Sequence, residues 1–258
     1  MHIDVGDGLR NGRSIGFRQG RLLKETARVP GRAFVMSGGY SSNNARRPER
    51  EGGITAFGRR LKRVILPVLA LLAAISAAYL YRAQPFTLID GIVPATSAWL
   101  SWGAIALPLG FFVIHLTNRR YGPAPAAAAV ALTWLIIVGV IVAHLLDPRA
   151  EIPWINDMAP RTGLALAAAL LFSQLVAVVA FDGMRSIRWW SAPLSGFFWA
   201  SLAFAGVFYP SAYLGTEVAW LGRMAVHFAA LLAGGAALTM VYWACRSLVR
   251  PLPGFAGY

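Results

Sequence analysis

Six long apolar runs, separated by short segments, constrain this chain more than any other feature. They cover approximately residues 64–81, 96–117, 124–146, 162–181, 194–212 and 218–245. A helix rises about 1.5 Å per residue, so each run can cross about 30 Å of hydrocarbon, the fifth only marginally. Charged residues make up 14% of the chain, compared with about 25% in soluble domains. The sequence therefore predicts an all-α membrane protein, a bundle of six transmembrane helices.

The region before the first run carries most of the formal net charge of +13. Residues 1–63 hold fourteen Lys/Arg against five Asp/Glu, whereas residues 64–258 hold ten against six. Residues 1–60 are expected to be a disordered basic tail, because they lack a sustained apolar period. A second methionine, Met36, suggests that residues 1–35 are an over-extended gene start. The transmembrane domain is then residues 61–250, followed by a short tail at 251–258.

The loop charges indicate an orientation in the membrane. Cytoplasmic loops of membrane proteins are enriched in Lys and Arg. With the N-terminus in the cytoplasm, six arginines lie inside, and these are Arg119, Arg120, Arg185, Arg188, Arg246 and Arg250. Only Arg82, Arg149 and Arg161 then fall outside, among acidic residues. We therefore expect a multi-pass protein of the bacterial inner membrane with both termini in the cytoplasm. The basic tail is interpreted as a topology signal that touches anionic lipid, with no nucleic-acid partner, since no RNA-binding or helix-turn-helix pattern accompanies it.

The sequence contains no pattern typical of an enzyme. Walker, Rossmann and HExxH motifs are absent, and one cysteine, Cys245, permits no intramolecular disulfide. We expect no cofactor and no metal. A haem held by two histidines is disfavoured, because at about 1.5 Å per residue the expected depths of His144 and His227 differ by ~9 Å, and His115 lies ~20 Å or more from either. A redox protein that binds haem or quinone is kept as a third hypothesis, and it predicts visible absorbance.

Polar side chains inside the apolar runs are the candidate site residues, because they are costly to place in a membrane. The strongest are His115, Gln174 and His227, while His144 lies near the end of its run. Hydroxyl side chains are weaker candidates, since they can bond to their own helix backbone. These are Ser173, Ser201 and Thr133. For every one of these residues the alternative is a hydrogen bond between helices that only holds the bundle together.

Two segments resemble a known family. Residues 101–123, SWGAIALPLGFFVIHLTNRRYGP, resemble the second helix of the queuosine-precursor transporters, also called vitamin uptake transporters. That helix has a Trp-Gly-Ala-like start and an end resembling T-D-L-T-N-R-R-Y-G. Residues 161–193, RTGLALAAALLFSQLVAVVAFDGMRSIRWWSAP, are similar to the family's fourth helix, with an Arg before it, a Gln within it and Trp-Trp-x-Ala-Pro after it. The resemblance extends over about residues 64–248.

This resemblance implies a six-helix fold similar to the substrate-binding subunits of vitamin importers. It also implies uptake of a 7-deazaguanine, such as queuine or its cyano or aminomethyl precursors. The family positions that carry over are Trp102, Asn118, Arg119, Arg161, Gln174 and Arg185. The substrate-binding residues that we expect are Trp102, His115, Asn118, Arg119, Arg161, Gln174 and His227. Gln174 could pair with a purine-like edge, and Trp102 could stack on the ring.

The chain also departs from the family pattern at its acidic positions. His115 stands where the family usually has Asp, and Ala177 where an acid follows the helix-four Gln. A helix-five Asp falls near Phe204, and a helix-six acid and Lys fall near His227 and Leu231. A cationic aminomethyl ligand would therefore lose its counter-ions. Either the ligand is neutral or transport has been lost, although the two histidines could still donate hydrogen bonds or couple transport to protons.

Two functions remain from different classes. The first is an importer of a small heterocycle, which binds non-covalently in the bundle and crosses by alternating access. The second is a divergent structural or accessory membrane subunit that transports nothing. A polar cavity that converges on Gln174 and His227 would favour transport. A bundle closed by alanine and phenylalanine would favour the accessory role. The lipid bilayer is a partner in either case, and the sequence fixes neither the energy source nor the oligomeric state.

Overall fold

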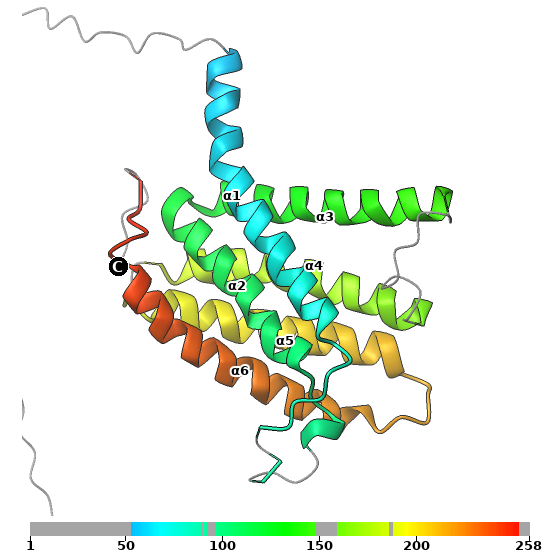
Figure 1. Cartoon of the computed structure of the whole chain (residues 1–258). Coiled ribbons are helices and arrows are strands. Elements are labelled where there is room, and N and C mark those ends of the chain that lie inside the picture. Colours follow the sequence, from blue (N-terminus) through cyan, green and yellow to red (C-terminus); the bar gives the residue numbers. More distant parts are fainter. Residues whose placement is uncertain (1–52, 89, 92–95, 148–158, 186–187, 253–258) are drawn as a thin grey trace, which may run out of the picture. The chain divides into compact units, whose positions relative to one another are not determined.

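The computed structural model describes residues 53–88, 90–91, 96–147, 159–185 and 188–252. Six long α-helices and one short 3₁₀ helix make up this part of the chain (Figure 1). They are α1 (Gly53–Leu80), η1 (Thr96–Ala98), α2 (Trp102–Tyr121), α3 (Pro123–Leu146), α4 (Pro160–Gly183), α5 (Ser191–Tyr213) and α6 (Trp220–Cys245). The prediction of an all-α bundle of six helices is confirmed. Of the expected tail at residues 1–60, residues 1–52 lie outside the described residues, as do residues 253–258 of the expected short tail at 251–258.

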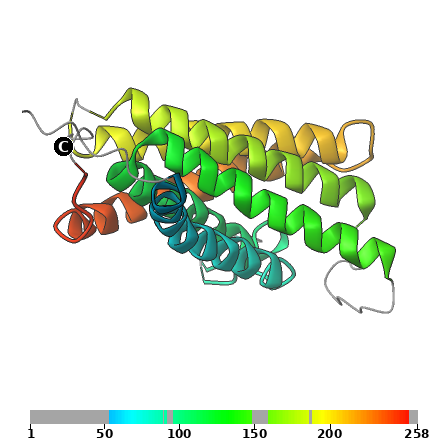
Figure 2. The same cartoon turned by 90° about the horizontal axis from the view of Figure 1, so that it is seen from above.

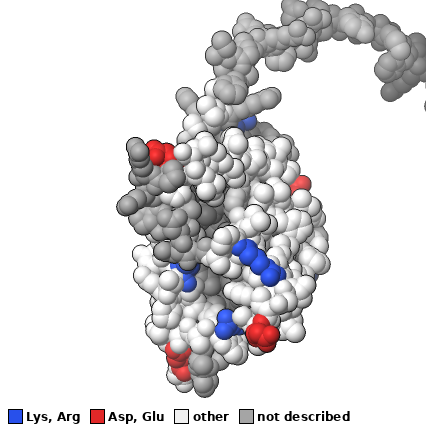
Figure 3. Space-filling view, turned by 90° about the vertical axis from the view of Figure 1, so that its right-hand side faces the viewer, with Lys and Arg blue, Asp and Glu red and all other residues white. Residues whose placement is uncertain are grey.

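Five of the six helices, α1 and α3 to α6, are long and apolar enough to cross a membrane. The chain is therefore a multi-pass membrane protein. The uncharged surface of the described residues fits this environment, because charged side chains are few and scattered on the face seen in Figure 3. The sequence predicts a sixth span over α2, but α2 is not among the five, because polar and charged residues near its end lower its hydropathy. It contacts each of the other five helices, which bury its polar residues His115, Asn118 and Arg119.

Consecutive helices run in opposite directions, so their ends gather in two groups (Figures 1 and 2). At the Tyr213 end of the bundle, α1, α3 and α5 finish and α2, α4 and α6 begin. At the Asn118 end, α1, α3 and α5 begin and α2, α4 and α6 finish. Helices α4 and α5 lie along each other, and α6 packs against α5 and α2.

Local backbone chemistry sets the bounds of α2 and corrects the predicted run at 96–117. Ser101 has extended backbone angles, and its Oγ accepts a hydrogen bond from the Ala104 N–H at 3.2 Å, which is an N-cap. The helix therefore begins at Trp102. It ends at Tyr121, because Gly122 adopts a φ of 87°, which favours glycine, and donates its N–H to Asn118 O at 2.8 Å. The first helix also differs, since the basic segment before residue 64 belongs to α1.

Small residues allow the helices of the bundle to approach closely. A Cβ on Gly103 would collide with the backbone oxygen of Ala78, so this glycine permits contact between α1 and α2. A Cβ on Gly235 would lie 2.7 Å from Cβ of Phe197, where α6 crosses α5. The interior that these contacts enclose contains several large aromatic side chains. The largest fully buried ones are Phe111, Phe181, Phe197, Phe204 and Tyr242.

Candidate functional site: a cavity at the Tyr213 end

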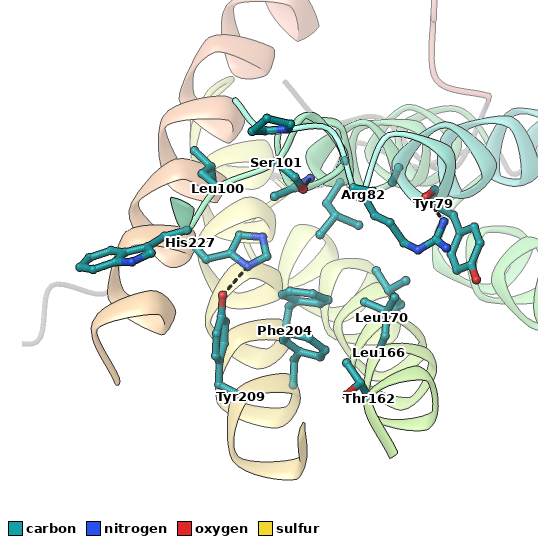
Figure 4. A pocket seen from close by; sticks show the side chains of 18 of the residues that line it. Tyr79, Arg82, Leu100, Ser101, Thr162, Leu166, Leu170, Phe204, Tyr209 and His227 are labelled. Carbon is teal, nitrogen blue, oxygen red and sulfur yellow. Dashed lines mark hydrogen bonds between the residues drawn. The ribbon is translucent and has the colours of Figure 1, made fainter. Parts of the chain in front are cut away.

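A cavity of about 470 Å³ lies inside the Tyr213 end of the bundle (Figure 4). Side chains from α1, α2, α4, α5 and α6 line it, together with the segment that joins α1 to α2. This volume is within the range of small-molecule sites, which is about 300–1,000 Å³. The cavity is therefore large enough for a small ligand.

One ridge of α4 forms a wall of the cavity and leads toward its floor. Thr162, Leu166 and Leu170 all line the cavity and follow one another at four-residue spacing. Residues four apart lie on one face of a helix, so the next member of this ridge is Gln174. Gln174 lies beyond the floor, because it does not line the cavity and is 1% exposed.

Helix α5 supplies an aromatic wall. The rings of Phe204 and Phe208 stack with centroids 5.5 Å apart and an interplanar angle of 16°, and Tyr209 meets Phe208 edge to face at 5.1 Å. Tyr213 follows one turn later and also lines the cavity. Such a wall suits a planar ring, because aromatic groups attract one another in offset-stacked and edge-to-face arrangements.

The polar centre of the cavity is a pair of residues from α5 and α6. Tyr209 Oη and His227 Nδ1 lie 3.0 Å apart and share a hydrogen bond (Figure 4). The other ring nitrogen, His227 Nε2, is buried and has no hydrogen-bond partner among the described residues. A buried polar atom without a partner costs free energy, about 1–3 kcal/mol. His227 therefore lines a cavity of ligand size and carries a buried, unsatisfied hydrogen-bonding atom.

Among the described residues, Arg82 is the only charged residue that lines the cavity. Its guanidinium lies 4.0 Å from the centre of the Tyr79 ring and donates a hydrogen bond to the Tyr79 carbonyl at 2.9 Å (Figure 4). Asp, Glu and Lys are absent from the described lining. The part of the lining that the structure describes is thus neutral to positive.

Among the seven expected substrate-binding residues, His227 alone lines this cavity. Gln174 is close below it, with its Oε1 accepting a hydrogen bond from Trp134 Nε1 at 2.8 Å. A Cβ on Gly110 would lie 3.7 Å from Gln174 Nε2, so the amide is enclosed between α2 and α3. In this conformation Gln174 therefore forms a hydrogen bond between helices, which is the alternative to a ligand contact that the sequence left open.

His115 lies deeper in the bundle and is fully buried. Its ring stacks on Phe181 with centroids 5.2 Å apart and meets Phe197 edge to face at 4.5 Å. Neither ring nitrogen has a hydrogen-bond partner among the described residues. The imidazole also touches the α5 backbone, because a Cβ on Gly196 would collide with it. His115 is thus a closely packed polar side chain outside the cavity.

Asn118 joins two helices at the opposite end of the bundle. Its Nδ2 donates to Val178 O at 2.9 Å, and its Oδ1 and main-chain oxygen both accept from Arg185. Arg185 also forms an ion pair with Asp182 at 2.9 Å. These bonds fasten α2 to the end of α4.

Arg119 and Arg120 hold the chain that follows α6. Arg119 Nε donates to Val249 O at 2.9 Å, and its Nη1 donates to Tyr242 Oη at 3.3 Å. Arg120 Nη1 donates to Arg250 O at 3.2 Å. Together with the bonds of Asn118, these contacts define the Asn118 cluster, which consists of Asn118, Arg119, Arg120, Asp182, Arg185 and Tyr242. The cluster closes the end of the bundle away from the cavity.

The remaining two residues lie at the Tyr213 end but outside the cavity lining. Trp102 is 38% exposed, packs edge to face on Phe86 at 4.8 Å, and lines a separate apolar groove between α1, α2 and α6. Arg161 donates to Ser211 O at 2.9 Å and to Leu214 O at 2.7 Å. These carbonyls belong to the last turn of α5, so Arg161 caps that helix from α4.

The structure therefore does not gather the seven expected residues at one site. It places His227 in the cavity, Gln174 below the floor, and Asn118 and Arg119 at the far end. Sequence reasoning missed Tyr209, which holds the His227 ring. The spacing of Tyr209 and Tyr213 at the end of an apolar run was the available signal, because it places two phenols on one face of a helix.

Comparison with known proteins gives one distant relative. The chain is 26% identical over 121 residues to a protein of Haemophilus influenzae named "Probable queuosine precursor transporter". The match covers 44% of this chain and 52% of that protein, so the chain spans about half the length of this relative. No family model and no solved structure matches the chain. The chain is thus a helical multi-pass membrane protein that is similar, over part of its length, to a protein named as a probable transporter.

Proposed function

We propose that this protein is a membrane transporter that imports a small heterocycle, most like a queuosine precursor of the 7-deazaguanine type. The observation that carries this proposal is the cavity at the Tyr213 end, where His227 Nε2 is buried without a partner beside an aromatic wall. The distant relative, which is named as a transporter, supports the same function. Binding would be non-covalent, with no chemical step.

The lining suggests how such a ligand would bind. Its ring would pack on Phe208 and Tyr209, and its polar edge would reach His227 Nε2. The bond between Tyr209 and His227 fixes the side of the imidazole that faces the ligand. If the phenol donates to Nδ1, then Nε2 carries the proton and pairs with an acceptor. If Nδ1 donates to the phenol, then Nε2 pairs with a donor.

A line of buried polar side chains leads from the cavity floor toward the other end of the bundle. Gln174 lies below the floor, and His115 and Asn118 follow along α2. His115, Thr133 and Ser201 all have buried polar atoms without a partner among the described residues. We propose that these groups gain partners when the helices move to open the Asn118 end, as alternating access requires. In this view the cavity is open on one side, and the Asn118 cluster closes the other.

The proposed orientation places the Tyr213 end outside the cytoplasm. The Asn118 end carries the six arginines expected inside, whereas Arg82, Arg161 and Arg223 lie toward the Tyr213 end. Cysteine labelling tests this in a Cys245→Ala background. A Leu214→Cys variant should react with an impermeant maleimide on intact cells, and a Leu248→Cys variant should react only after the cells are opened. The reverse pattern would overturn the orientation.

The function is tested in a bacterium that lacks both queuosine-precursor synthesis and its own transporter. The full chain should restore queuosine in tRNA at limiting external precursor. A His227→Ala variant should lose most of this restoration, whereas His144→Ala, which alters a buried histidine of α3 outside the cavity, should keep it. Protein in the membrane is measured for every variant. A wild-type chain that is present but restores nothing would overturn the proposal.

One observation favours the accessory-subunit alternative. Below the cavity, the bundle interior is closed by aromatic and alanine side chains, including Phe111, Phe197, Ala169, Ala177 and Ala200. A transporter caught with one side closed also requires such a seal, and the cavity supports transport over the accessory role. An accessory subunit predicts no precursor uptake, and its stability in the membrane would depend on a partner protein.

A further inference from the structure

We propose that the cavity at the Tyr213 end accepts an uncharged ring and discriminates against a cationic ring of the same shape. This inference rests on the proposed function and specifies the substrate class of the same site. It follows from the charges around the cavity, from the groups that could replace a counter-ion, and from the uncharged polar atoms that the lining offers.

Among the described residues, the one charged side chain that lines the cavity is positive. Arg82 lines it, and Arg223 lies on α6 one turn before His227, toward the Tyr213 end. The described carboxylates of this end lie outside the lining. Asp90 Oδ1 accepts the Ser97 N–H at 2.8 Å, and Glu217 is an exposed residue of the segment between α5 and α6. Within the described lining, an ammonium group would therefore meet the like charge of Arg82 and find no carboxylate partner.

Desolvation makes this arrangement unfavourable for a cation. Moving an ammonium from water into a largely apolar site is costly unless an opposite charge or several hydrogen-bond acceptors replace its hydration. Aromatic faces can offset part of that cost through cation–π attraction. The Tyr79 face is already covered by the Arg82 guanidinium at 4.0 Å, so this ring offers less of that attraction.

A neutral heterocycle meets no such penalty in the same site. His227 Nε2 can donate or accept a hydrogen bond, and the Thr162 hydroxyl on the opposite wall can do both. The stacked pair of Phe204 and Phe208 accommodates a flat uncharged ring. The lining therefore provides shape and hydrogen bonds without a charge requirement.

Two 7-deazaguanines that differ only at one substituent test this inference. One carries a nitrile and is neutral, and the other carries an aminomethyl group and is cationic at pH 7. Their dissociation constants are measured by calorimetry on the full chain in lipid nanodiscs. Wild-type protein should bind the nitrile compound about tenfold more tightly or better, because the ammonium stays uncompensated. Equal or tighter binding of the aminomethyl compound would overturn the inference while leaving the proposed function intact.

A matched pair of variants changes the charge of the lining at constant size. Thr162→Asp should shift the preference toward the aminomethyl compound by about tenfold, and Thr162→Asn should leave the ratio near its wild-type value. Arg82→Gln is a second, independent variant, and it should reduce the discrimination by removing the positive charge. Thermal unfolding confirms that each protein is folded. If the ratio of the two dissociation constants is unchanged in both Thr162→Asp and Arg82→Gln, the inference is contradicted. If neither compound binds folded wild-type protein, then the proposed function itself fails.

Discussion

At the scale of single residues, the proposed function depends on how His227 and its neighbours are held. The sequence identifies His227 and Gln174, because a polar side chain within an apolar run stands out. The spacing of Tyr209 and Tyr213 was only a weak signal, since tyrosine is common at the ends of membrane helices. The sequence could not reveal that Asn118 and Arg119 bind other protein groups at the far end, because those partners are 60 or more residues away in the chain.

Removing the Tyr209 hydroxyl should weaken ligand binding without removing the aromatic wall. Tyr209→Phe deletes the 3.0 Å hydrogen bond to His227 Nδ1 and frees the imidazole to change its tautomer. A hydrogen bond of this kind is worth about 1 kcal/mol, so affinity for the nitrile 7-deazaguanine should fall about fivefold. Tyr121→Phe, at the other end of the bundle, is the control and should bind normally. Unchanged affinity in Tyr209→Phe would show that this bond does not position His227.

The tight contact between Gly196 and His115 predicts a steric effect on stability. A methyl group at residue 196 would collide with the imidazole, which is enclosed by Phe181 and Phe197. Gly196→Ala should therefore destabilise the protein by about 1–3 kcal/mol. Gly206→Ala adds the same atom on the same helix, where nothing lies within 4 Å, and should be neutral or slightly stabilising. Thermal unfolding in detergent compares the two, and equal midpoints would mean that the contact is not tight.

At the scale of helices, α2 organises the bundle, since it contacts all five others. The sequence located this helix from its arginine-rich end, and Gly122 does terminate it. The start was predicted six residues early, because the apolar segment from residue 96 is interrupted by the Ser101 cap and by main-chain bonds to the end of α1. Composition alone does not distinguish a turn made of apolar residues from a helix. The hydropathy of α2 is low for a membrane span because polar residues such as His115, Asn118 and Arg119 lie within it, and the neighbouring helices bury these side chains.

The Asn118 cluster should stabilise the closed end of the bundle. Arg185 donates hydrogen bonds to Asn118, which lies on α2, and forms an ion pair with Asp182, which lies on α4. Arg185→Gln therefore removes bonds that join α4 to α2. The expected loss is about 1–3 kcal/mol in stability to unfolding, because hydrogen bonds to charged groups are worth that much. Arg188→Gln is the matched control, as Arg188 is exposed and lies over Trp190. Chemical denaturation of both variants in the same detergent measures the difference. Equal losses would place the stabilising bonds elsewhere.

At the scale of the whole molecule, the apolar runs of the sequence were sufficient to predict the class of fold and the order of the helices. They could not predict the cavity, which depends on residues of five helices and of the segment that joins α1 to α2 meeting at one end. The resemblance to queuosine-precursor transporters pointed to Gln174 and Asn118, whereas the packing of this chain points to His227 and Tyr209. The central claim is that the cavity holds the transported molecule.

Filling the cavity tests this claim most directly. Leu166 lines the cavity on α4, and Leu164 lies on the exposed face of the same helix. We would measure uptake of the nitrile 7-deazaguanine into cells that express the wild-type chain, Leu166→Trp or Leu164→Trp at equal membrane levels. The account predicts uptake by wild type and Leu164→Trp, and a loss of tenfold or more in Leu166→Trp, because the indole occupies the ligand's space. Equal uptake by all three proteins would contradict it, since the ligand would then cross by another route.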